Sequence, residues 1–348
     1  MPKILEVSEF LKRGDSLPII DVRSPAEYEH AHIPGALNLP LFNNEERATI
    51  GTIYKQKGRV KAVQHGLEIV GPKMKEFARF ALSLKSNEVL IHCWRGGMRS
   101  SSMAWLFETL DIKCYTLEGG YKAYRNFVLD YFSKDFKVTL LGGYTGSGKT
   151  ELISQLREAG EQVVDLEGLA NHKGSSFGAL GQRPQPSSEY FENLLHNEIS
   201  KLDLQKNIWL EDESRNIGRV SMPQNFWDTM RKSKLFLIKT PYEIRLERLL
   251  RDYTSVPREE ITKSILRLEK RLGFDKCKIA TEMSQQGNYD TAARICLDYY
   301  DKAYSYQLTT RFGEKLEGVP LIEFNSLTDD SITTKILTEY KKQYFNGN

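Results

Sequence analysis

The sequence lacks several features that would place it outside the class of ordinary globular proteins. Its only four cysteines, Cys93, Cys114, Cys277 and Cys296, form no C-x-x-C pair, which argues against a disulfide framework and a structural zinc site. No apolar run approaches the roughly 18–20 residues that a membrane span needs. The N-terminal MPKILEVSEF also lacks the basic and apolar regions of a signal peptide. We therefore expect a cytoplasmic protein without a membrane partner.

There is also little excess of charge of either sign. The 348 residues carry 49 Lys and Arg against 46 Asp and Glu, so the net charge of +3 does not by itself indicate a nucleic-acid partner. At this length two domains are the default expectation. Strands alternate with helices, which predicts an α/β fold with parallel sheets. We place a first domain at residues 1–134 and a second at 135–348, whose last third is mostly helical.

The stretch HCWRGGMRSSS (92–102) combines a cysteine, two arginines and two glycines directly after the apolar segment EVLIH. Backbone N–H groups of such a loop form a nest for an anion. His92, Arg95, Arg99 and the helix that follows favour the thiolate form of Cys93, which we interpret as a nucleophile. The alternative is a buried structural cysteine, which is our interpretation of the other three. Because Asp21, Cys93 and residues 118–120 end predicted parallel strands, we expect them to converge.

A second glycine-rich turn, GGYTGSGKT (142–150), fits the pattern G-x-x-x-x-G-K-[ST] at every position, between a predicted strand and a predicted helix. Its backbone N–H groups and the helix N-terminus can approach phosphate oxygens, Lys149 adds a positive charge, and Thr150 can reach a magnesium ion. We predict that this loop binds a diphosphate unit through Gly143, Thr145, Gly146, Ser147, Gly148, Lys149 and Thr150.

Further charged residues lie near the second turn in the sequence. Glu211 and Asp212 end a predicted strand and are candidates for orienting a metal ion, with a solvated strand end as the alternative. Arg183, in a long loop predicted at 170–187, and Arg215 are candidate anion clamps. Ordinary surface charge is the alternative for both arginines.

The segment DVRSPAEYEHAHIPGALNLP (21–40) resembles the entry signature of rhodanese-like domains, in which a loop cysteine carries a transferable sulfur. The loop of Cys93 falls where the rhodanese active-site loop is expected. Its C-x5-R spacing to Arg99 is one residue longer than the usual C-x4-R and resembles the loop of cysteine phosphatases of the same fold. A longer loop makes a wider nest, which suits a phosphate-sized anion.

Together with NNEERATIGTIYKQKG (43–58), LEGGYKAYR (117–125) and the second turn, the two halves resemble the bacterial tRNA 2-selenouridine synthases over nearly the whole chain. The resemblance implies that sulfur of wobble 2-thiouridine in tRNA is replaced by selenium from selenophosphate, which another enzyme supplies. It also implies an S-geranyl intermediate made from geranyl diphosphate held by the P-loop. Cys93 would take the selenium as a selenenylsulfide, while Arg99 and Arg95 neutralise the donor. No tightly bound cofactor is implied, and a magnesium requirement stays open.

Two further surfaces are expected from this resemblance. The geranyl chain needs an apolar pocket, for which FENLL (191–195) and Phe226–Trp227 are candidates, with helix core as the alternative. Transfer RNA needs a basic surface, and Arg245, Arg248 and Arg251 recur every third residue near one helix face. The rival interpretations are a Cys-dependent phosphatase or sulfurtransferase with a regulatory nucleotide-binding domain, and a non-catalytic binding module.

Overall fold

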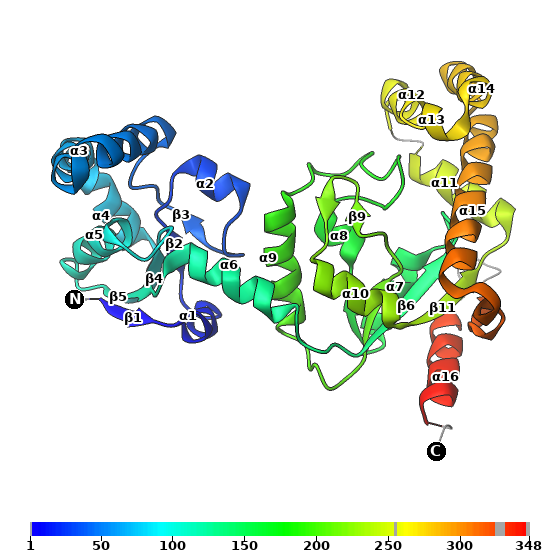
Figure 1. Ribbon diagram of the computed structural model, residues 1–348, viewed down its shortest axis with the longest axis horizontal. Helices are drawn as coiled ribbons and strands as arrows, with labels where there is room; N and C mark the ends of the chain where they lie inside the picture. Colours follow the sequence, from blue (N-terminus) through cyan, green and yellow to red (C-terminus); the bar gives the residue numbers. More distant parts are fainter. Residues whose placement is uncertain (1, 254–255, 324–330, 346–348) are drawn as a thin grey trace. The chain divides into compact units, whose positions relative to one another are not determined.

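The computed structural model of the chain describes residues 2–253, 256–323 and 331–345 (Figure 1). It divides into two compact units. One comprises Met1–Phe132 with Glu192–Asn197, and the other Ser133–Phe191 with Glu198–Asn348. Each unit is built on its own five-stranded parallel sheet with helices packed against it, which confirms the predicted α/β class. Among the described residues no helix is long and apolar enough to cross a membrane.

The sheet of the first unit has the strand order β1-β5-β4-β2-β3, and every neighbouring pair is parallel. Its central strands are almost completely buried, as expected for a parallel sheet covered on both faces. The elements follow in the order β1 (Lys3–Leu5), α1 (Val7–Gly14), β2 (Ile19–Asp21), α2 (Pro25–His30), β3 (Leu37–Asn38), α3 (Asn44–Val70), η1 (Gly71–Lys73), α4 (Met74–Ser83), β4 (Glu88–His92), α5 (Met98–Glu108), β5 (Lys113–Leu117) and α6 (Gly120–Tyr131).

The larger sheet of the second unit has the order β12-β11-β6-β8-β7, again with all pairs parallel. The elements before the C-terminal helices are β6 (Val138–Gly143), α7 (Lys149–Glu158), β7 (Gln162–Val164), α8 (Leu166–Ala170), α9 (Ser188–Ile199), β8 (Ile208–Glu211), β9 (Asn216–Ile217), β10 (Val220–Ser221), α10 (Gln224–Lys232) and β11 (Lys234–Lys239). Strands β9 and β10 form a separate antiparallel pair.

The C-terminal part is mostly helical, as predicted. It contains α11 (Tyr242–Tyr253), α12 (Arg258–Leu266), α13 (Glu269–Leu272), α14 (Phe274–Gln285), α15 (Tyr289–Phe312), η2 (Gly313–Gly318), β12 (Leu321–Glu323) and α16 (Ile332–Phe345). Figure 1 shows α12, α13 and α14 gathered beside the long helix α15, and α14 and α11 both contact α15. These helices enclose a hydrophobic core of their own.

Two strands of the second unit are short. Strand β7 ends at Val164, because the side chain of Asp165 accepts a hydrogen bond from the Gly168 N–H and caps the short helix α8. Strand β12 covers Leu321–Glu323, and Phe324 lies outside the described residues.

Candidate active sites

The loop of Cys93 joins the end of β4 to the start of α5, so the N-terminus of that helix faces the cysteine. The Cys93 side chain is buried. Its Sγ accepts a hydrogen bond from the Gly97 N–H at 3.3 Å and lies 3.3 Å from Ser100 Oγ. The Gly97 N–H and the N-terminus of α5 therefore place partial positive charge beside the sulfur.

The ends of neighbouring strands hold this loop in place, as the convergence argument predicted. The Tyr121 N–H, at the start of α6, donates to the Cys93 carbonyl at 2.8 Å. Gly120 has φ +62°, and a Cβ there would lie 2.4 Å from the Cys93 carbonyl oxygen, so only glycine allows this approach. From the other neighbouring strand, Asp21 Oδ2 lies 3.7 Å from His92 Nε2.

The Asp-Val-Arg signature has a structural role beneath this loop. Arg23 and Asp21 form a buried ion pair at 2.6 Å, and the Arg23 guanidinium lies 3.7 Å from the centre of the Tyr121 ring. Burial lowers the pKa of His92 to about 4, so this imidazole is uncharged at neutral pH. The expectation that His92 supplies positive charge to Cys93 is therefore wrong.

The two loop arginines differ in their surroundings. Arg99 Nη1 donates to Glu27 Oε2 at 2.9 Å, so its charge is partly neutralised by a carboxylate. Arg95 is exposed and makes no hydrogen bond or ion pair within the described ranges. Both arginines line the same pocket as Cys93, where an anion could meet them.

This pocket has a volume of about 1120 Å³ and extends from Cys93 along α3 and α4. Apolar side chains form most of its wall, among them Phe42, Val63, Leu67, Met74, Phe77 and Trp105. The Cys93 site therefore combines a glycine-rich loop with a large apolar surface.

The P-loop joins β6 to α7, in the strand–loop–helix setting that the motif requires. Lys149 Nζ donates to the Gly143 carbonyl at 3.2 Å, so it lies across the loop that would hold the phosphates. Thr150 Oγ1 donates to Glu167 Oε2 at 3.3 Å. Of the seven residues predicted to bind a diphosphate, Gly143 ends β6, and the other six belong to the loop or to the first turn of α7. All seven line a cleft of about 820 Å³.

The prediction that Arg245 and Arg248 lie on an exposed tRNA-binding face is wrong, because both side chains are buried against the P-loop. Arg248 Nη1 donates to the Gly146 carbonyl at 2.8 Å, and a Cβ at Gly148 would lie 2.4 Å from that nitrogen. Arg245 forms two hydrogen bonds to Asp301 and one to the Thr145 carbonyl. Of the three arginines, only Arg251 is exposed.

We expect Arg248 to strengthen anion binding in the cleft. The variant Arg248→Met should lower the affinity for inorganic pyrophosphate roughly tenfold to hundredfold, the range for losing a hydrogen bond to a charged group. Isothermal titration calorimetry measures this affinity. Arg251→Met, one turn further on the same helix, is the control and should change it little. Equal losses in the two variants would show that Arg248 has no particular role.

The two carboxylates predicted to orient a metal ion have other partners. Asp212 binds Arg311 at 2.7 Å and accepts a hydrogen bond from Tyr304 at 3.4 Å. Glu211 Oε2 accepts from the Leu166 N–H, and burial raises the pKa of Glu211 to about 8. The described residues contain no group of three His, Cys, Asp or Glu side chains that could hold a metal ion. Asp212 lines the P-loop cleft, and the metal-orienting role of the two carboxylates stays a prediction.

The raised pKa of Glu211 predicts a pH-dependent stability. Burial is the main cause, and the nearby charges of Asp165 and Glu167 add to it. Between the ordinary value of 4.5 and about 8 the folded state binds the extra proton, so stability falls as pH rises through this window. Glu211→Gln should remove this loss. Urea unfolding at a series of pH values measures the free energy of unfolding of both proteins. The difference in favour of Glu211→Gln should grow as pH rises through the window, whereas a constant difference would contradict the assignment.

The candidate anion clamps and the candidate apolar residues differ in whether they line the P-loop cleft. Arg215 lines the P-loop cleft, whereas Arg183 is exposed and is not among the residues that line it. Phe191, Leu195 and Phe226 are buried core residues, as the alternative interpretation held, and Trp227 lines the cleft. Sequence reasoning missed several further basic or aromatic lining residues, among them Lys173, Arg231 and Tyr304. They carry no local motif, and only the tertiary fold brings them to the P-loop.

Comparisons with known proteins agree with the two-part organisation. The family model described as the tRNA 2-selenouridine synthase AAA domain matches residues 136–316, and the rhodanese-like domain model matches residues 4–127. Among solved structures, the N-terminal domain of a Clostridium difficile 630 protein is 44% identical with a TM-score of 0.35, covering 36% of this chain and 99% of that one.

Two curated relatives are similar over most of their length. The tRNA 2-selenouridine synthase of Sulfurovum sp. (strain NBC37-1) is 35% identical over 331 residues, and that of Shewanella frigidimarina (strain NCIMB 400) is 37% identical over 336 residues. Each alignment covers 84% of this chain and 89% of the relative. The chain therefore belongs to the tRNA 2-selenouridine synthase family.

Proposed function

We propose that this protein converts wobble 2-thiouridine of tRNA to 2-selenouridine through an S-geranyl intermediate, with geranyl diphosphate and selenophosphate as substrates. One observation carries the proposal: a chain of this family combines a P-loop in one unit with a glycine-rich loop around a cysteine in the other, and we assign an anion to each. The family of the chain supports tRNA as the substrate.

The P-loop site is assigned to geranyl transfer. The sulfur of 2-thiouridine attacks the first carbon of geranyl diphosphate, a C–S bond forms, and the C–O bond to the diphosphate breaks. The diphosphate leaves with the electron pair, and the base releases its N3 proton. Lys149, Arg248 and the loop N–H groups would stabilise the charge that develops on the leaving diphosphate. The alkylated sulfur is then a better leaving group than a thiocarbonyl sulfur.

The Cys93 site is assigned to selenium transfer. Selenium has the same oxidation level in selenophosphate and in selenouridine, so a path through a Cys93 selenenylsulfide would oxidise it and need a thiol reductant. Attack of the Cys93 thiolate on phosphorus needs none: an S–P bond forms, and the P–Se bond breaks to release selenide. Selenide displaces geranylthiolate at C2 of the base. Water then hydrolyses the S–P bond, which releases phosphate and restores the Cys93 thiol. Arg95 and Arg99, which line this pocket, would neutralise the donor anion.

The proposal also includes a selenophosphate-supplying enzyme as a partner and a cytoplasmic location, where the four free thiols of this chain stay reduced. The test is to incubate the protein with thiolated tRNA, geranyl diphosphate and selenophosphate, and to weigh the nucleosides by mass spectrometry. Selenouridine and S-geranyl-thiouridine are expected. Unmodified tRNA, together with phosphatase or thiosulfate sulfurtransferase activity, would favour the rival enzyme instead.

A further inference from the structure

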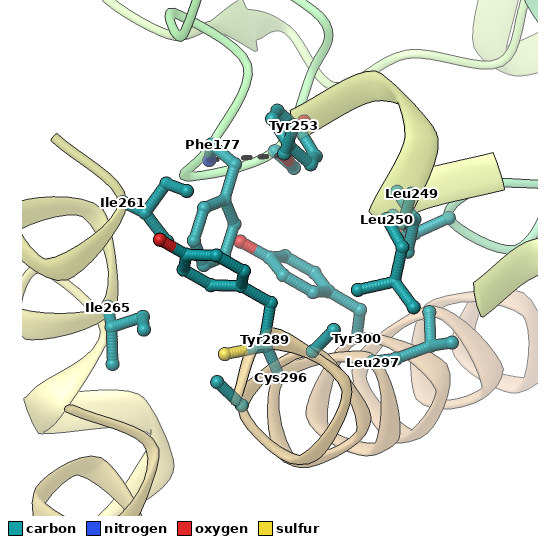
Figure 2. Close-up of a pocket in the computed structure, with 14 residues that line it drawn as sticks. Phe177, Leu249, Leu250, Tyr253, Ile261, Ile265, Tyr289, Cys296, Leu297 and Tyr300 are labelled. Carbon is teal, nitrogen blue, oxygen red and sulfur yellow. Dashed lines mark hydrogen bonds between the residues drawn. The ribbon is translucent and has the colours of Figure 1, made fainter. Parts of the chain in front are cut away.

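An apolar cavity of about 100 Å³ lies among the C-terminal helices of the second unit. Figure 2 shows its wall, to which α11, α12, α15 and the loop after α8 all contribute. The side chains are almost all hydrocarbon or aromatic, and include Phe177, Leu250, Tyr253, Ile261, Cys296 and Leu297. Burial raises the pKa of Cys296 to about 12, as expected for a thiol in an apolar wall.

This cavity adjoins the P-loop cleft. Thr145 of the P-loop lines both, and so do Ser175, Leu249, Tyr253 and Tyr300. A molecule held by the P-loop therefore has an apolar space directly beside it, within the same unit.

Two helices connect the cavity to the anion site. In α11, Arg245 and Arg248 bond to P-loop carbonyls, and the next turns supply Leu249 and Tyr253 to the cavity. In α15, the first half lines the cavity, and further along Tyr304 accepts a hydrogen bond from the Gly143 N–H at 3.0 Å. The fold thus fixes the distance between an anion cradle and an apolar pocket.

Polar groups of Tyr300 and Ser175, at the rim of the cavity, form hydrogen bonds within the protein. The Tyr300 hydroxyl accepts a hydrogen bond from the Ser176 N–H at 2.8 Å, and the Phe177 N–H donates to Ser175 Oγ at 3.2 Å. The first bond attaches the loop that carries Phe177 to α15, and the second lies within that loop. Rings and aliphatic groups form most of the cavity wall (Figure 2), which suits a hydrocarbon better than a sugar.

We propose that this cavity holds the hydrocarbon tail of a prenyl diphosphate whose head group lies in the P-loop, and that its size selects the length of the tail. The assignment rests on the proposed function, because it places the tail of the same substrate. Its physical basis is the burial of apolar surface, which favours each methylene that leaves water.

The test uses equilibrium binding of the full-length protein without tRNA, so that no transfer occurs. Calorimetry compares inorganic pyrophosphate with dimethylallyl, geranyl and farnesyl diphosphate. The parent should bind geranyl diphosphate at least tenfold more tightly than pyrophosphate. Ala293→Phe, which fills the cavity from α15, should remove this preference and leave pyrophosphate affinity within twofold. The affinity for dimethylallyl diphosphate, which has a shorter tail, should fall less in this variant than the affinity for geranyl diphosphate.

Two other variants complete the test. Ala293→Ser keeps the cavity open and should behave like the parent, and Leu250→Ala enlarges it and should shift preference toward farnesyl diphosphate. If the parent binds geranyl diphosphate no better than pyrophosphate, or if Ala293→Phe weakens both equally, the cavity is not the tail site. If the parent binds neither compound, the proposed function itself fails at the P-loop.

Discussion

Cys93→Ser protein is expected to make no selenouridine, while it geranylates thiolated tRNA at the parent rate. A serine hydroxyl at this position stays protonated at neutral pH, so it offers no nucleophile to selenophosphate. The P-loop, which we assign to geranyl transfer, belongs to a different compact unit with its own sheet. S-geranyl-thiouridine should therefore accumulate in the presence of both substrates.

Mass spectrometry of the tRNA nucleosides gives both products in one measurement. Cys114→Ser is a matched control, because Cys114 is a buried thiol of the same unit that donates to the Ile112 carbonyl and does not line the Cys93 pocket. It should keep selenium incorporation. Selenouridine formed by the Cys93→Ser protein at the parent rate would remove Cys93 from the reaction.

Lys149→Ala is expected to reduce geranyl transfer at least a thousandfold. Lys149 is the full positive charge of the P-loop, and its Nζ lies across the loop at the Gly143 carbonyl. In the transition state the diphosphate gains negative charge, and removing one preorganised donor to such a group costs about a hundredfold to a thousandfold. Loss of the ground-state contact adds to this effect.

The same variant should keep the second reaction, the exchange of the S-geranyl group for selenium. If tRNA is geranylated beforehand, Lys149→Ala should still exchange the S-geranyl group for selenium, because Cys93 is intact. Lys239→Ala, an exposed lysine of β11 paired with Glu323, is the control and should keep both activities. Geranyl transfer by Lys149→Ala at the parent rate would overturn the assignment of the diphosphate to the P-loop.

The local geometry of the Cys93 loop and of the P-loop could be predicted from sequence because consecutive residues set it. A strand that ends in a cysteine or in glycines and continues into a helix sets its own loop geometry, so Cys93 and Lys149 could be identified locally. The convergence of Asp21 and Gly120 on the Cys93 loop followed from the rule that parallel strands end at one edge.

The surroundings of the sites could not be predicted in the same way. A spacing of three correctly placed Arg245 and Arg248 on one helix face, but it could not show that this face packs on a loop about a hundred residues earlier. Likewise, the apolar cavity takes Phe177 from a loop and Ile261 and Tyr300 from distant helices. The segment that looked apolar in sequence, FENLL, instead contributes Phe191 and Leu195 to a core.

The central claim is that one protein geranylates the thiolated base and then exchanges the geranylthio group for selenium. The most direct measurement supplies the parent protein with thiolated tRNA and selenophosphate, omits or adds geranyl diphosphate, and weighs the nucleosides. The account predicts no selenouridine until geranyl diphosphate is added, and then S-geranyl-thiouridine before selenouridine. Selenouridine formed at the same rate without geranyl diphosphate would contradict it.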